Sequence, residues 1–203
     1  MLMSLLKRER VKILPIHVNY GQLAEVREWS ALRRFCAAAG LPTPIRIDAS
    51  GLESVPCGLT RRSKRWKSDP FFPGRNLILA TMGASVGFSR GYRTVALGLV
   101  ANTLYPDATK EFTQVASEAL SESFGAKILV TAPLLQFSKR EVVELGKASH
   151  APLSLTYSCQ LGKLPPCGRC SSCRDRVAAL KDIREGRGKT HRTTRKHVGA
   201  RGR

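Results

Sequence analysis

The sequence has no apolar run that approaches the roughly 20 residues of a transmembrane helix. A secretory signal is not expected either, because the apolar part of residues 1–10 is short and no small-residue cleavage site follows it. We therefore expect a cytoplasmic protein, in which free thiols and metal thiolates are normal.

Acidic residues are scarce, with 15 Asp and Glu against 34 Lys and Arg, and the formal net charge of +19 is typical of proteins that bind nucleic acid. Its distribution weakens this interpretation. Residues 187–203 are basic, contain no acid and have almost no apolar content, so they are predicted to be a disordered tail. A second basic cluster surrounds Trp66 in an irregular loop. Phosphate contact and simple solvated charge are alternatives for both; nucleic-acid binding through the tail is possible but not favoured.

Four of the six cysteines lie close together, separated by gaps of seven, two and two residues: Cys159, Cys167, Cys170 and Cys173. Two-residue gaps let neighbouring thiolates converge on one ion, and four soft ligands suit a closed, tetrahedral zinc site. An iron–sulfur cluster and a pair of disulfides are the alternatives. Cys36 falls in an apolar stripe and is expected in the core, whereas Cys57 is expected to be a free thiol.

Short β-branched runs alternate with helical patterns along the chain, which predicts an α/β fold with a parallel sheet and helices on both faces. The predicted strands are 11–18, 45–48, 94–99 and 128–131, and the predicted helices are 23–39, 77–89, 110–124, 138–149 and 172–185. Helix 23–39 has an apolar stripe through Val26 and Phe35, and helix 77–89 is apolar on nearly every side and should be buried. We divide the chain into an α/β nucleotide-binding domain (1–155), a zinc-binding segment with a final helix (156–186) and the tail (187–203).

Several short motifs occur in an order that resembles a known family: Tyr20-Gly21-Gln22, Pro73-Gly74-Arg75-Asn76-Leu77, Tyr105-Pro106-Asp107, Pro133 with Ser138-Lys139, and the four-cysteine segment. Together they resemble the 7-cyano-7-deazaguanine synthases of queuosine biosynthesis, which are pyrophosphatase-loop ATP enzymes. The resemblance runs from about residue 11 to 180. It implies an adenine nucleotide alpha-hydrolase-like, Rossmann-like fold.

The resemblance also implies a reaction. ATP activates the carboxylate of 7-carboxy-7-deazaguanine as an adenylate, ammonia displaces AMP to give an amide, and a second activation dehydrates the amide to the nitrile. The implied cofactors are ATP, Mg²⁺ and a structural Zn²⁺, and the implied assembly is a homodimer. The enzyme class is an ATP-dependent carbon–nitrogen ligase.

Three residues are the candidates for catalysis. The planar guanidinium of Arg75 suits bidentate contact with a phosphate or a carboxylate. Arg75 and Lys139 both lie in the first turn of a predicted helix, where a cation is unfavourable against the helix dipole unless an anion lies nearby. Asp107 could bind magnesium or a ring N–H, or it could be a simple turn residue.

Nucleotide-binding candidates lie in the turns after predicted strands and at a helix start, where ligands bind in parallel α/β sheets. They are Tyr20, Gly21, Gln22, Asn76 and Gly98. Tyr20 and Gln22 could stack on or bond to a base. Asn76 could cap its helix or read a base edge.

Two departures from the family stand out. The family begins with a strand and a Ser-Gly-Gly-x-Asp-Ser loop that holds the ATP pyrophosphate, and this sequence has no such loop. A misplaced start site or truncated gene is the preferred explanation, and a homologue that lost ATP chemistry is the alternative. If the start site is misplaced or the gene is truncated, we expect the 203-residue chain to have poor activity and its sheet to contain a hole. The loop around residues 102–109 is also shorter than in the family, which affects the exact substrate.

Two other functions fit the same residues. A related pyrophosphatase-loop enzyme that modifies tRNA would use the basic tail to hold RNA, and a thiolating version would need a reactive cysteine such as Cys57. An inactive, zinc-stapled RNA-binding homologue is the non-enzymatic alternative.

Overall fold

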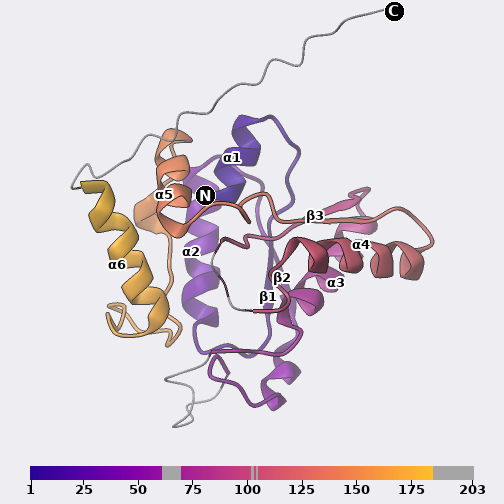
Figure 1. Cartoon of the computed structure of the whole chain (residues 1–203), viewed down its shortest axis with the longest axis horizontal. Helices are drawn as coiled ribbons and strands as arrows, with labels where there is room; N and C mark the ends of the chain where they lie inside the picture. Colours follow the sequence, from indigo (N-terminus) through magenta and orange to yellow (C-terminus); the bar gives the residue numbers. More distant parts are fainter. Residues whose placement is uncertain (61–69, 102, 104, 185–203) are drawn as a thin grey trace, which may run out of the picture.

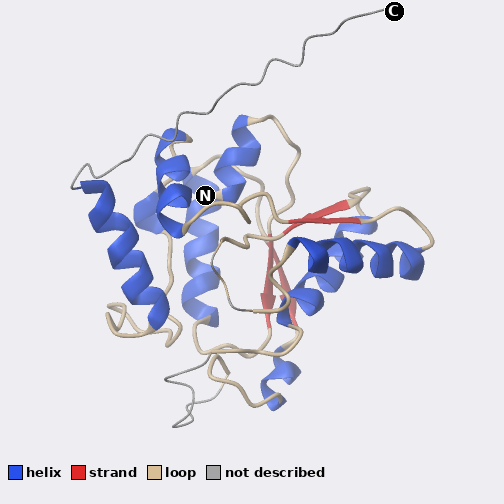
Figure 2. Ribbon diagram, viewed as in Figure 1, coloured by secondary structure: helices blue, strands red, loops and turns tan. Residues whose placement is uncertain are grey.

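A computed structural model describes residues 1–60, 70–101, 103 and 105–184, and Figures 1 and 2 show their arrangement. The basic cluster around Trp66 and the basic tail, for which we expected disorder, lie outside these residues. No helix in the described part of the chain is both long enough and apolar enough to cross a lipid bilayer.

Helices and strands alternate along the described chain, which confirms the α/β class. The elements are α1 (Leu2–Arg8), β1 (Ile16–Asn19), α2 (Glu25–Ala38), β2 (Ile45–Asp48), η1 (Ser50–Ser54), α3 (Arg75–Phe88), β3 (Thr94–Ala96), α4 (Lys110–Phe124), β4 (Leu129–Thr131), α5 (Lys139–Ala148), η2 (Leu153–Leu155) and α6 (Ser171–Arg184).

Local capping explains why the α4 and α5 boundaries agree with the sequence. Thr109 precedes α4 and its hydroxyl accepts a hydrogen bond from the Phe112 N–H, at 3.0 Å. Gly125 ends the helix in the left-handed conformation, with φ 58°. Before α5, Ser138 and Glu141 form the reciprocal capping box that their spacing predicts.

The four strands form two separate parallel pairs. β1 pairs with β2, with Ile16 opposite Ile45, and β3 pairs with β4, with Thr94 opposite Leu129. Among the described residues no strand pairing joins β1 to β3, and Figure 2 shows the two pairs pointing in different directions. The single continuous sheet that we expected is therefore present only as two halves.

A cavity of about 920 Å³ lies between the two halves, lined by residues 11–18 on one side and 90–99 on the other. The strand predicted over 11–18 begins only at Ile16, directly after Pro15. Proline has no N–H to donate to a strand ladder, which accounts for the late start.

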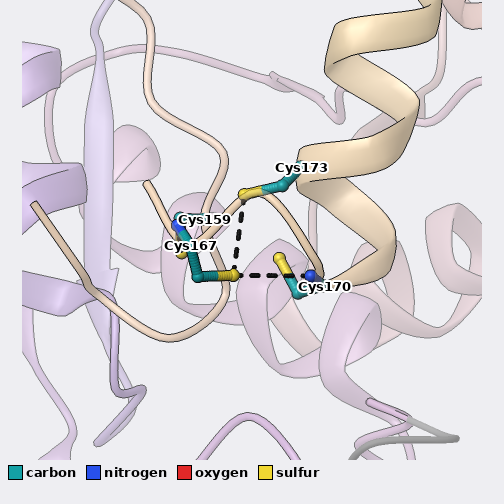
Figure 3. Close-up of side chains that lie close together, drawn as sticks. All are labelled: Cys159, Cys167, Cys170 and Cys173. Carbon is teal, nitrogen blue, oxygen red and sulfur yellow. Dashed lines mark hydrogen bonds between the residues drawn. The ribbon is translucent and has the colours of Figure 1, made fainter. Parts of the chain in front are cut away.

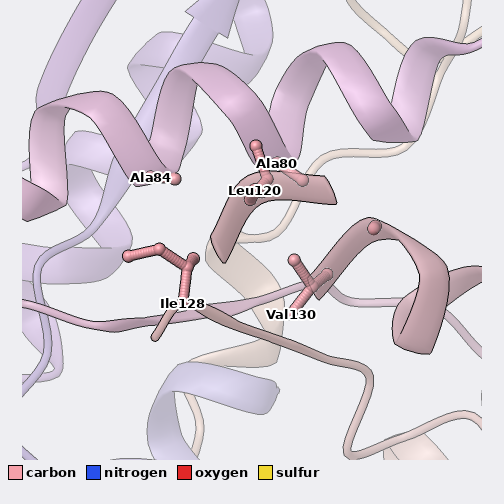
Figure 4. Packing of buried hydrophobic residues seen from close by; sticks show 6 residues of the cluster. Ala80, Ala84, Leu120, Ile128 and Val130 are labelled. Carbon is pink, nitrogen blue, oxygen red and sulfur yellow. The ribbon is translucent and has the colours of Figure 1, made fainter. Parts of the chain in front are cut away.

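The main hydrophobic core lies where α3 and α4 cover β4 (Figure 4). Its buried side chains are Ala80, Ala84, Ala116, Leu120, Ile128 and Val130. The alanines on the facing sides of α3 and α4 let these helices approach closely, and Leu120 fills the space above the strand.

Two serines of α4 bond to the backbone of the segment that contains β4. The Ser121 hydroxyl accepts from the Ile128 N–H at 2.9 Å, and the Ser117 hydroxyl accepts from the Val130 N–H at 2.9 Å. Ile128 and Val130 are buried, so unpaired N–H groups there would be costly. The helix thereby satisfies the edge of the strand that faces away from β3.

Two expectations about buried faces are wrong. Helix α3 is not buried all round, because Leu77 is 41% exposed and only one side contacts the core. On α2, Val26 is 69% exposed. The rest of the predicted stripe is in place, because Phe35 and Cys36 are buried together with Ala31, so the expectation fails at Val26 alone.

Candidate functional site

Most of the residues that were predicted from the sequence to bind a nucleotide line the cavity between the two strand pairs. It is lined by Tyr20 and Gln22 after β1, by Arg75 and Asn76 at the start of α3, and by Gly98 after β3. Its volume of about 920 Å³ falls within the range of small-molecule sites, roughly 300–1,000 Å³. The turn after β1, the start of α3 and the segment after β3 thus contribute to one site.

The turn after β1 is held rigidly by its own side chains. The Gln22 carbonyl oxygen accepts from the Tyr20 N–H at 2.8 Å, and the Asn19 carbonyl oxygen accepts from the Gly21 N–H at 3.0 Å. Gly21 has φ 79°, and a Cβ there would lie 2.4 Å from the Glu53 Cβ, so only glycine fits. Gly21 shapes the turn but does not line the cavity.

The amide nitrogen of Gln22 is also occupied. It donates to the Val18 carbonyl at 3.1 Å and to the Glu28 carboxylate at 3.1 Å. Gln22 is buried, and these bonds use both of its amide protons. We infer that Gln22 positions Glu28 and the turn rather than reading a base.

Asn76 and Asp107 meet across 31 residues of sequence. The Asp107 carboxylate accepts from the Asn76 backbone N–H at 2.9 Å, and the Asn76 amide donates to the Asp107 carbonyl at 2.8 Å. A carboxylate at a helix N-terminus satisfies an unpaired N–H and complements the helix dipole. Asp107 therefore joins the beginnings of α3 and α4 at the edge of the cavity.

Burial and opposite charge set the electrostatics of this cavity. Burial raises the pKa of Tyr20 to about 12, although the nearby Arg75 guanidinium acts in the opposite direction. Burial also raises the pKa of Glu28, against a hydrogen bond from Gln22 and the charge of Arg75. Arg75 is thus the cation that acts on both Tyr20 and Glu28, and Lys12, Arg90 and Arg93 also line the cavity.

Lys139 does not line this cavity. It lies at the start of α5, where its ammonium pairs with the Asp175 carboxylate of α6. Both side chains are about half exposed, so the pair contributes little stability by itself. The pair links the first turn of α5 to the second turn of α6, and a catalytic role for Lys139 stays a prediction.

The four predicted metal ligands converge on one point. Their sulfur atoms all lie within 4.8 Å of one another, and Cys159, Cys170 and Cys173 are buried (Figure 3). The Cys167 and Cys173 sulfurs are 3.9 Å apart. Zinc–sulfur bonds of about 2.3 Å would give a tetrahedron with edges of about 3.8 Å, so the spacing fits a four-coordinate metal. All six cysteines of the chain are free, which argues against disulfides.

Backbone N–H groups prepare these sulfurs for a metal. Cys167 donates its N–H to the Cys159 sulfur, and Cys170 donates its N–H to the Cys167 sulfur, both at 3.4 Å. Burial raises the pKa of Cys159, but N–H groups outweigh it and lower the pKa to about 6. Burial and the neighbouring sulfurs raise the pKa of Cys173 to about 12. A divalent cation would be needed to hold all four sulfurs as thiolates.

The cysteine segment packs directly beside the cavity turn. A Cβ on Gly162 would lie 2.2 Å from the carbonyl oxygen of Leu23, the residue that follows Gln22. Farther along, Arg176 of α6 donates to the Thr156 hydroxyl at 2.5 Å and to the Leu153 carbonyl at 3.1 Å. The cluster and α6 therefore buttress the start of α2 and the turn that carries Tyr20 and Gln22.

These features define an α/β protein of parallel strands with a ligand-sized cavity beside a four-cysteine centre that could hold a metal. The sequence matches the family described as "Queuosine biosynthesis protein QueC" over residues 1–184, and the chain belongs to this family.

Curated relatives agree with this assignment. The chain is 32% identical to a 7-cyano-7-deazaguanine synthase of Aquifex aeolicus, with 90% of this chain and 91% of the relative aligned. It is 32% identical to one of Methanothrix thermoacetophila (85% and 84% aligned). It is 28% identical to one of Campylobacter jejuni strain 81116 (88% and 87% aligned).

Glu28 is the site residue that the sequence analysis missed. It lies four residues after Ala24 and three before Ala31, both of which are buried. An acidic residue at this spacing from small buried residues falls on the inward face of a helix. The signal was present in the sequence, but the predicted stripe was drawn through apolar side chains alone and left Glu28 out.

Proposed function

We propose that this chain is an ATP-dependent ligase that converts 7-carboxy-7-deazaguanine and ammonia to 7-cyano-7-deazaguanine. The family and the names of the curated relatives support this proposal. The observation that carries it is that five of the eight non-cysteine candidates, Tyr20, Gln22, Arg75, Asn76 and Gly98, line one cavity beside the four-cysteine centre.

In this proposal, a carboxylate oxygen of the substrate attacks the α-phosphorus of ATP, and pyrophosphate leaves. Ammonia then attacks the carboxyl carbon and AMP leaves, which gives the amide. A second activation at the amide oxygen, followed by loss of AMP and a proton, gives the nitrile. Arg75 holds the substrate carboxylate or a phosphate through its two-pronged guanidinium, and its charge stabilises the negative charge that develops on these oxygens.

Tyr20 and Asn76 would define the position of the ligand's rings. Tyr20 is placed by an edge-on contact with Phe72, with the ring centroids 5.6 Å apart, and Phe72 is buried. Asn76 is fixed by its two bonds with Asp107. Side chains that are held in place in this way, and that touch the ligand, favour one orientation of the substrate.

We further infer that the metal is zinc with a structural role, held by Cys159, Cys167, Cys170 and Cys173. Four thiolates leave no open coordination position, so the ion would stabilise the segment beside the cavity rather than take part in chemistry. Mg²⁺ would bind mainly through ATP phosphates, with the second oxygen of Asp107 as the nearest protein ligand.

The finer features of the assembly also belong to this proposal. The two half-sheets correspond to one Rossmann-like sheet, the unit 1–155 carries the nucleotide site, and the protein works as a cytoplasmic homodimer on small molecules. A light-scattering measurement of molar mass tests the dimer.

Binding and product analysis test the proposed function. Calorimetry should show that the protein binds 7-carboxy-7-deazaguanine, and mass spectrometry should detect AMP and the nitrile with ATP and ammonium present. Arg75→Ala should weaken substrate binding about 10- to 100-fold, the usual cost of a charge-assisted hydrogen bond. Arg34→Ala, on the exposed side of α2, is the matched control.

Failure of the wild-type protein to bind 7-carboxy-7-deazaguanine would contradict the proposal. A tight, salt-dependent complex with tRNA in its place would favour the tRNA-modifying or RNA-binding alternatives.

A further inference from the structure

Glu28 is a carboxylate on the inward face of α2 with one oxygen available to a ligand. It lines the cavity. Its Oε2 accepts the hydrogen bond from Gln22, at 3.1 Å. Its Oε1 makes none of the hydrogen bonds found in the described part of the chain. A carboxylate oxygen that faces a cavity and has no protein donor can accept a hydrogen bond from a ligand there.

The charged groups around Glu28 leave this oxygen free for a cation. Glu25, on the same helix, is already bonded to Arg46 at 2.8 Å and lies 3.8 Å from His17. Arg75 acts on Glu28 through its charge but forms no ion pair with it in the described structure. Tyr20, the remaining titratable neighbour, is neutral at physiological pH, since its ordinary pKa near 10 is already high and burial raises it to about 12. A carboxylate and a guanidinium therefore share one cavity without neutralising each other by direct contact.

This separation suits a reaction that joins an anionic carboxylate to a cationic nitrogen. A carboxylate bound at Arg75 and an ammonium ion bound at Glu28 would each meet a charge of opposite sign, inside the same cavity. Ammonium is the form in which ammonia is present near neutral pH, and it must lose a proton before its nitrogen can attack.

We propose that Glu28 binds the ammonium ion and accepts its proton, so that ammonia is released beside the activated carboxyl carbon. This inference rests on the proposed function. The N–H bond of ammonium breaks and its proton passes to Glu28 Oε1; the nitrogen lone pair forms the C–N bond as the carbon–oxygen bond to AMP breaks. The second proton lost from nitrogen leaves with AMP or water, and Glu28 returns its own to solvent.

The oxygen without a protein donor suits ammonium. The ring edge of a deazaguanine presents two adjacent N–H donors, which pair best with both oxygens of a carboxylate. Gln22 already occupies one acceptor position of Oε2, whereas one N–H of ammonium can pair with Oε1 alone and leave its other N–H groups for substrate oxygens and solvent.

Glu28→Gln tests the proposal, because glutamine keeps the size of the side chain but cannot take a proton. Two measurements are made on the full chain. In the first, 7-carboxy-7-deazaguanine is bound and the melting temperature is followed as ammonium chloride or potassium chloride is added. In the second, ammonium-dependent AMP formation is measured. We expect ammonium to stabilise the wild-type complex more than potassium does, and we expect Glu28→Gln to lose this difference and raise the KM for ammonium about 10- to 100-fold.

Three controls separate this role from a structural one. Glu28→Asp should restore part of the ammonium response, and Glu122→Gln, on the exposed side of α4, should behave as wild type. Hydroxylamine is already neutral near pH 7, so Glu28→Gln should keep far more activity with hydroxylamine than with ammonium. The affinity for 7-carboxy-7-deazaguanine should not change.

Two results would overturn the inference. One is that ammonium stabilises Glu28→Gln as much as it stabilises the wild type, or that it does not stabilise a wild-type protein that binds the substrate. The other is a loss of affinity for 7-carboxy-7-deazaguanine in Glu28→Gln, which would place the base edge at Glu28. A wild-type protein that does not bind this substrate at all would instead contradict the proposed function.

Discussion

Replacing Cys170 with serine should remove the metal and unfold the segment around it. The sulfur spacing fits a tetrahedral ion, and a hydroxyl is a poor substitute for a thiolate ligand. Structural zinc sites contribute about 10–16 kcal/mol of apparent binding free energy, whereas whole domains are stable by only about 5–15 kcal/mol. The α5–α6 contact and the bonds of Arg176 hold α6, whereas the four sulfurs of the cysteine segment come together at one point, so the order of this segment should depend on the ion.

Elemental analysis and amide hydrogen exchange together test this prediction. Wild-type protein should carry about one zinc per chain, and Cys170→Ser should carry little. Amide protection should fall across 157–184 but not in the α3–α4 core. Cys57→Ser is the matched control, because Cys57 lies outside the cluster and a serine can keep its contact with Thr60. Full metal content and protection in Cys170→Ser would refute the reasoning, and iron with labile sulfide in the wild type would replace zinc by an iron–sulfur cluster.

Two further predictions concern stability. Ser121→Ala should lower the free energy of unfolding by about 1–3 kcal/mol, because it leaves the buried Ile128 N–H unpaired, and denaturant titration measures this loss. Ser123→Ala, on the exposed side of α4, is the control and should change the free energy of unfolding little. Equal losses in the two variants would contradict the prediction. Because burial raises the pKa of Glu28, the folded state binds this proton more tightly than the unfolded state. Below the ordinary glutamate pKa, Glu28→Gln and the wild type should therefore have the same free energy of unfolding. As pH rises through the raised pKa, Glu28→Gln should become the more stable protein. A stability difference that stays constant across pH would contradict this prediction.

Local signals in the sequence predicted the parts of the fold that depend on neighbouring residues. Strand β2 and helix α4 have the predicted bounds, and the capping box of Ser138 and Glu141 is present. The convergence of the four cysteines was also predictable, because their short gaps restrict where the sulfurs can lie.

Features that depend on long-range contacts could not be predicted in this way. Strand pairing is non-local, so alternating strands and helices could not distinguish one sheet from two parallel pairs. The burial of each residue of α2 depends on which neighbours cover it, so Val26 is exposed although Phe35 and Cys36 of the same apolar stripe are buried. Lys139 had a plausible anion partner in a phosphate, yet its partner is Asp175, which lies 36 residues away in the sequence.

The hydroxyls of Ser117 and Ser121 also bear on how this protein avoids unwanted self-association. An open strand edge offers unpaired amides that another chain can extend into a longer sheet, and proteins commonly protect such edges with lysine, proline or bulges. Here the amides of Ile128 and Val130 are already bonded to serines of the adjacent helix. A foreign strand would have to displace α4 before it could add to β4, so this side of the molecule is a poor template for aggregation even though none of the usual deterrents stands on the strand itself.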